Sequence, residues 1–119
     1  MIRHILLIAF KAGTQAGDIA AVRAAFLGIP ARVNGVVAVE WGENDSPEGR
    51  AEGFTHSVLM TFADEAARQR YLPHPDHEAL KAIFRPVLDR IIVLDYTLQA
   101  KDAVSIWRLA PRTRSASCG

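Results

Sequence analysis

The short segment Tyr71-Leu-Pro-His74-Pro-Asp-His77 brings together the side chains of this chain that are best suited to proton transfer. Histidine has the unperturbed side-chain pKa closest to neutrality, so it can both accept and release a proton near pH 7. Two of the four histidines of the chain stand here, beside a tyrosine. The segment is therefore the first candidate for general acid–base chemistry.

His77 is predicted to lie in the first turn of a helix, because Pro75 favours such a position. Free backbone N–H groups and partial positive charge at a helix start disfavour an imidazolium, and burial acts in the same direction. The negative charge of Asp76 acts in the opposite direction. We expect His77 to stay neutral near pH 7, as a general base must.

The other two histidines, His4 and His56, lie on predicted strands. Strand alternation puts each on an apolar face, and we expect both faces to meet a helical layer from which His77 points back. The periodicity thus predicts a pocket between sheet and helices. The residues predicted to contact a ligand there are His4, Leu6, Ile8, His56, Val58, Leu80 and Phe84, and the candidate catalytic pair is Tyr71 with His77.

Other interpretations of these residues stay open. A histidine on an apolar face is more often a hydrogen-bonded core residue than a catalyst, and a tyrosine at a helix end often packs. His74 and His77 could also be metal ligands with a third histidine, but no carboxylate or thiolate lies in register, so no metal is expected. The sequence has neither a nucleophile-elbow motif nor a glycine-rich phosphate loop, and no cofactor is expected.

Hydrophobic periodicity predicts the segments that position these residues. Strands are predicted over residues 3–10, 36–41, 54–62 and 92–98, with residues 42–53 as a polar loop. Between the first two strands, helical spacing connects Ile19, Val22, Phe26 and Ile29. Thr14 or Asp18 would cap that helix and Pro30 would end it.

Two helical segments are predicted before the last strand. The first begins at Asp64 and ends near Tyr71, where Pro73 and Pro75 interrupt it. The second begins at Asp76, and its apolar stripe consists of His77, Leu80, Phe84, Val87, Leu88 and Ile91.

The order strand, helix, strand, strand, helices, strand is that of a ferredoxin-like unit, an α+β protomer with an antiparallel sheet and helices on one face. The first predicted strand is apolar on both sides, so the other face of the sheet also needs cover. A homodimer that packs sheet against sheet provides this cover with one self-complementary surface. We therefore predict a homodimer that pairs through this face of the sheet.

Composition and charge exclude several classes of protein. Fourteen Lys and Arg against thirteen Asp and Glu give a net charge of +1, which offers no electrostatic case for a nucleic-acid partner. The apolar N-terminal run is too short to span a bilayer and lacks a cleavage site, so no membrane partner is expected. The single cysteine, Cys118, is typical of a reducing compartment, and a cytoplasmic location is expected.

Residues 99–119 form a C-terminal extension beyond the predicted domain at 1–98. Residues 103–107 are apolar enough to dock as an extra strand or arm. Residues 111–119 are typical of a flexible terminus.

Five short motifs together resemble the stress-responsive dimeric α/β-barrel (Dabb) family over residues 1–98. They are Ile2-Arg-His4-Ile, Trp41-Gly-Glu-Asn, Glu52-Gly-Phe-Thr-His56, the segment from Tyr71 to His77, and Leu94-Asp95-Tyr96. The resemblance implies a ferredoxin-like protomer that pairs with a second copy to close a homodimeric α/β barrel. It also implies a relation to a plant polyketide cyclase, whose catalytic tyrosine and histidine fall on Tyr71 and His77 and whose pocket histidines fall on His4 and His56.

The function expected from the resemblance is a stress-response protein that binds a small organic ligand and could catalyse a cofactor-free, aldol-type cyclisation. His77 would then remove a proton from a carbon flanked by carbonyls, while Tyr71 would hydrogen bond the developing enolate. One alternative is a non-catalytic interaction protein whose histidines are structural. Another is a related barrel monooxygenase.

Overall fold

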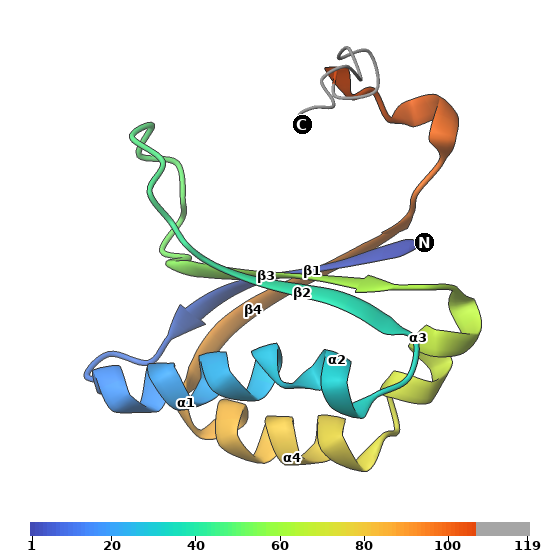
Figure 1. Cartoon of the computed structure of the whole chain (residues 1–119). Helices are drawn as coiled ribbons and strands as arrows, with labels where there is room; N and C mark the ends of the chain where they lie inside the picture. The colour runs from blue at the N-terminus through green and yellow to red at the C-terminus, as the bar shows by residue number, and fades with distance from the viewer. Residues whose placement is uncertain (107–119) are drawn as a thin grey trace, which may run out of the picture.

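The computed structural model of the protein, which describes residues 1–106, is built on one antiparallel sheet (Figure 1). Its four strands lie in the order β2-β3-β1-β4. Their bounds are Ile2–Phe10 for β1, Val36–Glu43 for β2, His56–Phe62 for β3 and Leu88–Thr97 for β4. This topology confirms the predicted ferredoxin-like α+β fold.

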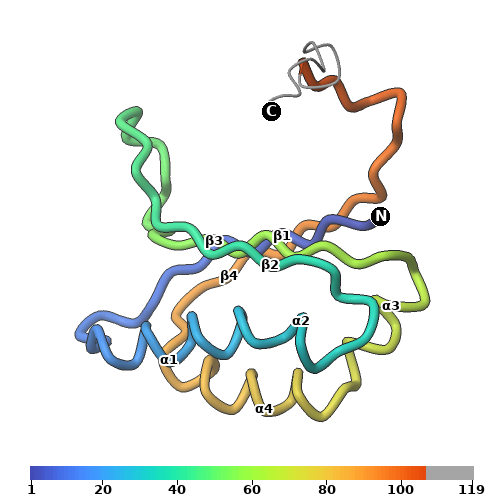
Figure 2. Tube along the Cα trace, viewed as in Figure 1, coloured from blue at the N-terminus to red at the C-terminus, as the bar shows by residue number. Residues whose placement is uncertain are grey.

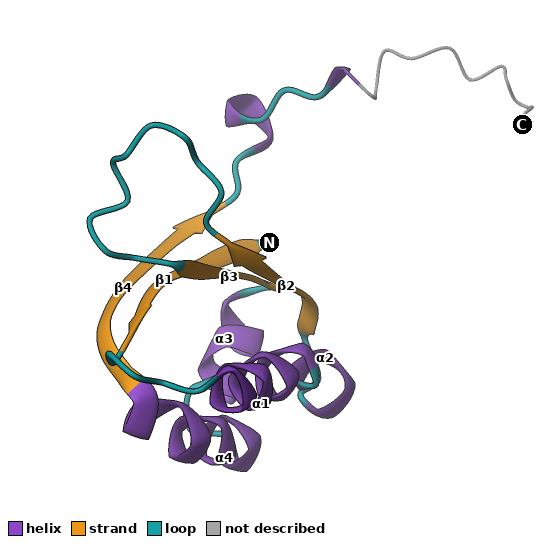
Figure 3. Cartoon of the chain, turned by 90° about the vertical axis from the view of Figure 1, so that its left-hand side faces the viewer, coloured by secondary structure: helices purple, strands orange, loops and turns teal. Residues whose placement is uncertain are grey.

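All four α-helices lie on one face of this sheet (Figures 1 and 3). They are α1 (Ala16–Leu27), α2 (Ile29–Arg32), α3 (Glu65–Tyr71) and α4 (Pro75–Phe84), followed by short 3-10 turns at Arg85–Val87 and Ala100–Asp102. None of the helices within residues 1–106 has the length and apolar character needed to cross a membrane. The helices form a layer that packs against the sheet.

The hydrophobic core fills the space between the two layers. Alternate residues of β1 and β3 point into it, among them Ile8, Val58, Met60 and Phe62, each with a fully buried side chain. Phe26 of α1 packs edge-on against Phe84 of α4, with ring centroids 5.4 Å apart. Burial of these side chains holds α1 and α4 against the sheet.

The first helix ends earlier than predicted, and Pro30 has a different role. α1 stops at Leu27, and Gly28 separates it from α2. Pro30 lies in the first turn of α2. The N–H groups of a first turn have no acceptor within the helix, so a proline is tolerated at this position. The predicted caps were also wrong, because the N-cap is Gln15 and its side chain makes no capping hydrogen bond.

The last helix is shorter than predicted, and the last strand is longer. Pro86 follows α4 in a 3-10 turn and cannot donate a helical hydrogen bond. The chain then enters β4 at Leu88, which pairs with Phe10 of β1. Leu88 and Ile91 therefore belong to the sheet and not to the helical stripe.

The sheet face opposite the helices carries a group of apolar side chains. We call this surface the open face and define it by Ile5, Leu7, Ile92, Leu94 and Tyr96, which alternate with the helix-facing residues of β1 and β4. Leu94 is 54% exposed. Within residues 1–106, no helix covers this face (Figure 3).

Two segments rise beside the open face. The loop between β2 and β3 and the segment that follows β4 extend from opposite ends of the sheet, both away from the helices (Figure 2). In the second segment, Val104 is 94% exposed and Ile106 is 75% exposed. Neither side chain docks on its own protomer, and the part of the predicted arm and tail at 107–119 lies outside the described residues.

Gly35 is a position where an added methyl group should destabilise the fold. Its φ is +95°, and a Cβ there would lie 2.5 Å from the Cβ of Ala67, which is fully buried. We expect Gly35→Ala to lower the free energy of unfolding by about 1–2 kcal/mol for backbone strain and by about 1–3 kcal/mol more for overpacking. Urea unfolding measures the total loss of stability.

Gly49→Ala is the matched control. Gly49 also has positive φ, at +70°, but nothing lies within 4 Å of a Cβ there. The control should show the backbone cost alone. Equal losses of stability in the two variants would show that the contact with Ala67 relaxes without cost.

Candidate functional site

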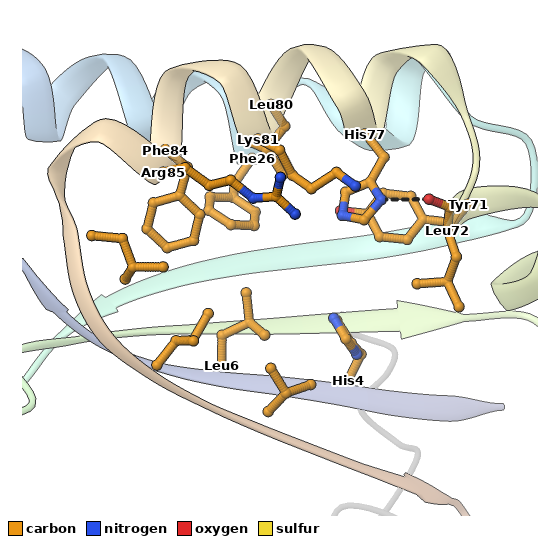
Figure 4. Close-up of a pocket in the computed structure, with 13 residues that line it drawn as sticks. His4, Leu6, Phe26, Tyr71, Leu72, His77, Leu80, Lys81, Phe84 and Arg85 are labelled. Atoms are coloured by element: carbon orange, nitrogen blue, oxygen red, sulfur yellow. Dashed lines mark hydrogen bonds between the residues drawn. The ribbon is translucent and has the colours of Figure 1, made fainter.

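A cavity of about 310 Å³ lies between α4 and the sheet (Figure 4). Its walls come from β1, β4, α1, α4 and the end of α3. Most of its lining is apolar, and the lining residues are His4, Leu6, Phe26, Tyr71, Leu72, His77, Leu80, Lys81, Phe84, Arg85, Leu88, Ile91 and Val93. The volume falls at the lower end of the roughly 300–1,000 Å³ typical of ligand pockets.

The cavity is open because no helix covers the edge strand β4 within the described part of the chain. Ile91 and Val93 point to the helical side of the sheet, since they pair with the core-facing residues Ile8 and Leu6. They nevertheless remain 37% and 55% exposed. A ligand could therefore enter along the edge of the sheet.

Six of the predicted site residues line this cavity, and three do not. Those that line it are His4, Leu6, Tyr71, His77, Leu80 and Phe84. Ile8 and Val58 share the helix-facing side of the sheet but lie in the core away from this cavity and are not among its lining residues. His56 is the third exception.

His56 lies too far along the sheet to join the other histidines. It pairs with Ile8, whereas His4 pairs with Met60, so the two histidines are separated by four residues along β3, or about 13 Å. The ring of His56 instead packs against Phe10 and Trp41. Its Nδ1 bonds the hydroxyl of Thr55 at 2.8 Å.

Tyr71 and His77 lie next to each other, with ring centroids 4.2 Å apart. Tyr71 is the last residue of α3, and its ring also contacts Phe62 at 5.4 Å. His77 is in the first turn of α4, as predicted. The turn between the two helices, which contains Pro73, brings both rings to the same end of the cavity (Figure 4).

A hydrogen bond fixes which nitrogen of His77 can accept a proton. The Nδ1 of His77 lies 2.8 Å from the carbonyl oxygen of Leu72. A carbonyl oxygen can only accept, so Nδ1 must carry the hydrogen. In the neutral ring, Nε2 then has the free lone pair, and Figure 4 shows it on the side of the ring turned away from Leu72.

Burial shifts the pKa values of both side chains. It lowers the pKa of His77, an effect to which the charges of Lys81 and His4 add and which the hydrogen bond to Leu72 and the charge of Glu78 oppose. Burial also raises the pKa of Tyr71 well above its ordinary value. Near pH 7, His77 is thus a neutral base beside a phenol that stays protonated and can donate a hydrogen bond.

His4 is oriented by a carboxylate from the neighbouring strand. Its Nδ1 lies 2.6 Å from Oδ1 of Asp95, while Oδ2 of Asp95 accepts a hydrogen bond of 3.1 Å from Arg68. Arg68 is paired in turn with Glu65 in the same helix. Because the carboxylate of Asp95 accepts, Nδ1 of His4 is the donor in this contact, which fixes the orientation of the ring.

His74 has a structural role at the start of α4. It is the N-cap, and its Nδ1 accepts the backbone N–H of Asp76 at 3.0 Å. Residues 1–106 contain no group of three or more His, Cys, Asp or Glu side chains placed to hold a metal ion. His74 therefore caps α4, while His77 lines the cavity.

Sequence periodicity missed several residues of this site. In the sequence, Asp95 stands out only as part of the motif Leu94-Asp95-Tyr96. Its contact with His4 depends on the register between β1 and β4, which periodicity does not predict. Lys81 and Arg85 follow His77 at intervals of four residues, a helical spacing that could have placed all three on one face. That spacing was the available signal.

Comparison with known sequences identifies the family of this fold and site. The model of the Stress Responsive A/B Barrel Domain family (Dabb) matches residues 2–98. The stress-response A/B barrel domain-containing protein HS1 of Arabidopsis thaliana is 30% identical over 95 residues, which cover 80% of this chain and 87% of HS1. Olivetolic acid cyclase of Cannabis sativa is 23% identical over 96 residues, covering 81% of this chain and 95% of the cyclase.

Solved structures share the same architecture. The crystal structure of At3g17210 from Arabidopsis thaliana has a TM-score of 0.79 at 30% identity and covers 88% of this chain and 99% of its own. Hydroxynitrile lyase from Passiflora edulis has a TM-score of 0.77 at 26% identity, with 83% and 94% covered. A dimeric ferredoxin-like protein from Thermobifida fusca has a TM-score of 0.69 at 25% identity, with 82% and 90% covered. With the family model matching nearly the whole described domain, the chain belongs to the stress-responsive A/B barrel domain (Dabb) family.

Proposed function

We propose that this protein binds a small organic molecule in the cavity beneath α4 and catalyses proton transfer at a carbon next to a carbonyl group, without a cofactor. The observation that carries this proposal is the hydrogen bond from His77 to the carbonyl of Leu72. It leaves a basic nitrogen on a ring that packs against the ring of Tyr71 in a largely apolar cavity. The second prediction from the sequence, a non-catalytic protein with a filled core, is less well supported because this cavity is open.

The proposed reaction begins when Nε2 of His77 takes a proton from the carbon. The electron pair of the broken C–H bond moves toward the carbonyl oxygen, which becomes an enolate oxygen. The hydroxyl of Tyr71 donates a hydrogen bond to that oxygen, and this contact is worth more as negative charge develops. The imidazolium of His77 then returns its proton, either to carbon or to the oxygen of a second carbonyl that the enolate has attacked.

The site supports this chemistry in two further ways. The apolar lining excludes much of the water that would otherwise solvate the enolate and weaken the hydrogen bond from Tyr71. Tyr71 is only 1% exposed but lines the cavity, and within residues 1–106 its hydroxyl has no hydrogen-bond partner, so we expect the hydroxyl to bond a ligand held inside the cavity. The names of two relatives, a cyclase and a lyase, support an enzymatic function on this scaffold.

Deuterium exchange tests this function directly. The probe is phenylacetone, a ketone whose benzylic hydrogens exchange slowly without a catalyst, and NMR in D₂O follows the loss of their signal. We expect the protein to accelerate this exchange in a saturable manner. Binding of the probe without acceleration would show that the cavity is a ligand site only.

We further propose that two copies of the chain pair through the open face. This face exposes several large apolar side chains on β4, including Ile92, Leu94 and Tyr96. A two-fold axis lets the same surface cover itself. The Thermobifida fusca relative, described as dimeric, supports this arrangement.

A further inference from the structure

The charged side chains that line the cavity all have the same sign. Among the thirteen lining residues, Lys81 and Arg85 are cationic, and none is Asp or Glu. The protein as a whole is nearly balanced, with a net charge of +1. The positive charge at this cavity is therefore a local feature rather than a consequence of composition.

Arg85 forms no close ion pair within the described residues, although the carboxylate of Glu78 interacts with its charge at longer range. No carboxylate oxygen of residues 1–106 lies within 4.0 Å of its guanidinium nitrogens, although Arg68 and Arg90 each have such a partner. Lys81 is different, because its Nζ lies 2.7 Å from a carboxylate oxygen of Glu78. The guanidinium of Arg85 thus keeps its five hydrogen-bond donors for another acceptor.

Both cations extend along the same wall of the cavity as the proposed base. His77, Lys81 and Arg85 follow one another at intervals of four residues, so they share one side of the polypeptide as it leaves α4. Figure 4 shows the side chains of Lys81 and Arg85 reaching along this wall toward His77. An anionic group bound by Arg85 would therefore lie close to the proposed reacting carbon.

We propose that the cavity selects organic carboxylates, with Arg85 binding the carboxylate group and Lys81 adding to the positive potential. The body of the ligand would lie against the apolar side chains, among them Leu80 and Phe84. A guanidinium presents two parallel N–H groups that match the two oxygens of a carboxylate. This inference rests on the proposal that the cavity is the ligand site, and it adds the class of ligand.

The test compares two probes that differ in charge and otherwise only by one methyl group. The first is 5-phenyl-4-oxopentanoate, which carries the same benzylic ketone as phenylacetone together with a carboxylate. The second is its neutral methyl ester. We expect the wild-type protein to bind the carboxylate at least about tenfold more tightly than the ester at low salt, as measured by calorimetry or NMR titration. High salt should reduce this ratio, because part of the attraction is screened.

Four variants assign the preference to its source. In Arg85→Gln the ratio of the affinities for carboxylate and ester should fall to about one. In Lys81→Gln this ratio should fall by a smaller factor, because the charge of Lys81 is already paired with Glu78. Lys101→Gln, which removes an exposed cation from the segment after β4, is the matched control and should keep the full ratio. His77→Gln should also keep it while losing the exchange activity.

The outcomes separate this inference from the proposed function. If wild type binds both probes equally, or if Arg85→Gln retains the preference, selection for carboxylates by Arg85 is wrong while the ligand site stands. If neither probe binds, the ligand site itself is wrong and the selection fails with it. Loss of exchange in His77→Gln with the preference intact supports both proposals.

Discussion

Replacing His77 by Gln is expected to reduce the exchange of the benzylic hydrogens of phenylacetone by about 10²–10⁴-fold, the usual contribution of a general base. Glutamine can still donate a hydrogen bond to the carbonyl of Leu72, so the local structure should be kept. Its amide cannot accept a proton at neutral pH. The variant therefore removes the base and keeps the donor that holds its position.

The matched control for this prediction is His74→Asn. His74 caps α4 and does not line the cavity, and an asparagine oxygen can also accept the N–H of Asp76. The control should exchange the probe at the wild-type rate. Equal activity of His77→Gln and wild type would exclude His77 as the base.

The pH dependence of exchange gives an independent measure of the same group. The base is active only when neutral, and the pKa of His77 is lowered chiefly by burial. Exchange corrected for the buffer reaction should therefore rise as pH increases through an apparent pKa below about 6.5, the ordinary value for histidine. Above that pKa it should reach a plateau. A midpoint well above neutrality would contradict the assignment of this group as a desolvated base.

Replacing Leu94 by Arg is expected to convert the proposed homodimer into monomers. Leu94 lies on the open face and pairs with Ile5 across the strands. Placing a charge in an apolar contact costs several kcal/mol per ion, and two-fold symmetry introduces it twice. The dissociation constant should rise by about a thousandfold or more. Sedimentation or light scattering over a range of protein concentrations measures it.

Ile83→Arg is the matched control for the dimer. Ile83 of α4 is also large, apolar and well exposed, at 44%, but it lies in the helical layer rather than on the open face. This variant should associate as wild type does. Dissociation of both variants alike, or of neither, would show that the open face is not the site of pairing.

The architecture was predictable because each element carries its own periodicity. Alternation along β1 and β3, and helical spacing along α1 and α4, depend only on neighbours in sequence, and both lead to the observed order of elements. Two of the errors fall at prolines. Pro30 begins a helix where an end was predicted, and Pro86 ends one where a continuation was predicted, because the effect of a proline depends on which N–H the local fold requires.

The sequence by itself determined that Tyr71 and His77 face a common space, since the short turn between α3 and α4 and the first-turn position of His77 are local properties. Only the tertiary structure decided their neighbours. His4 meets Asp95 and Arg68, whereas His56 lies elsewhere, because the register of β1 against β3 and β4 is set by the packing of segments far apart in the chain. The helices leave the edge of β4 uncovered, and this opens the cavity that Arg85 lines. This opening also depends on how the helices pack on the sheet.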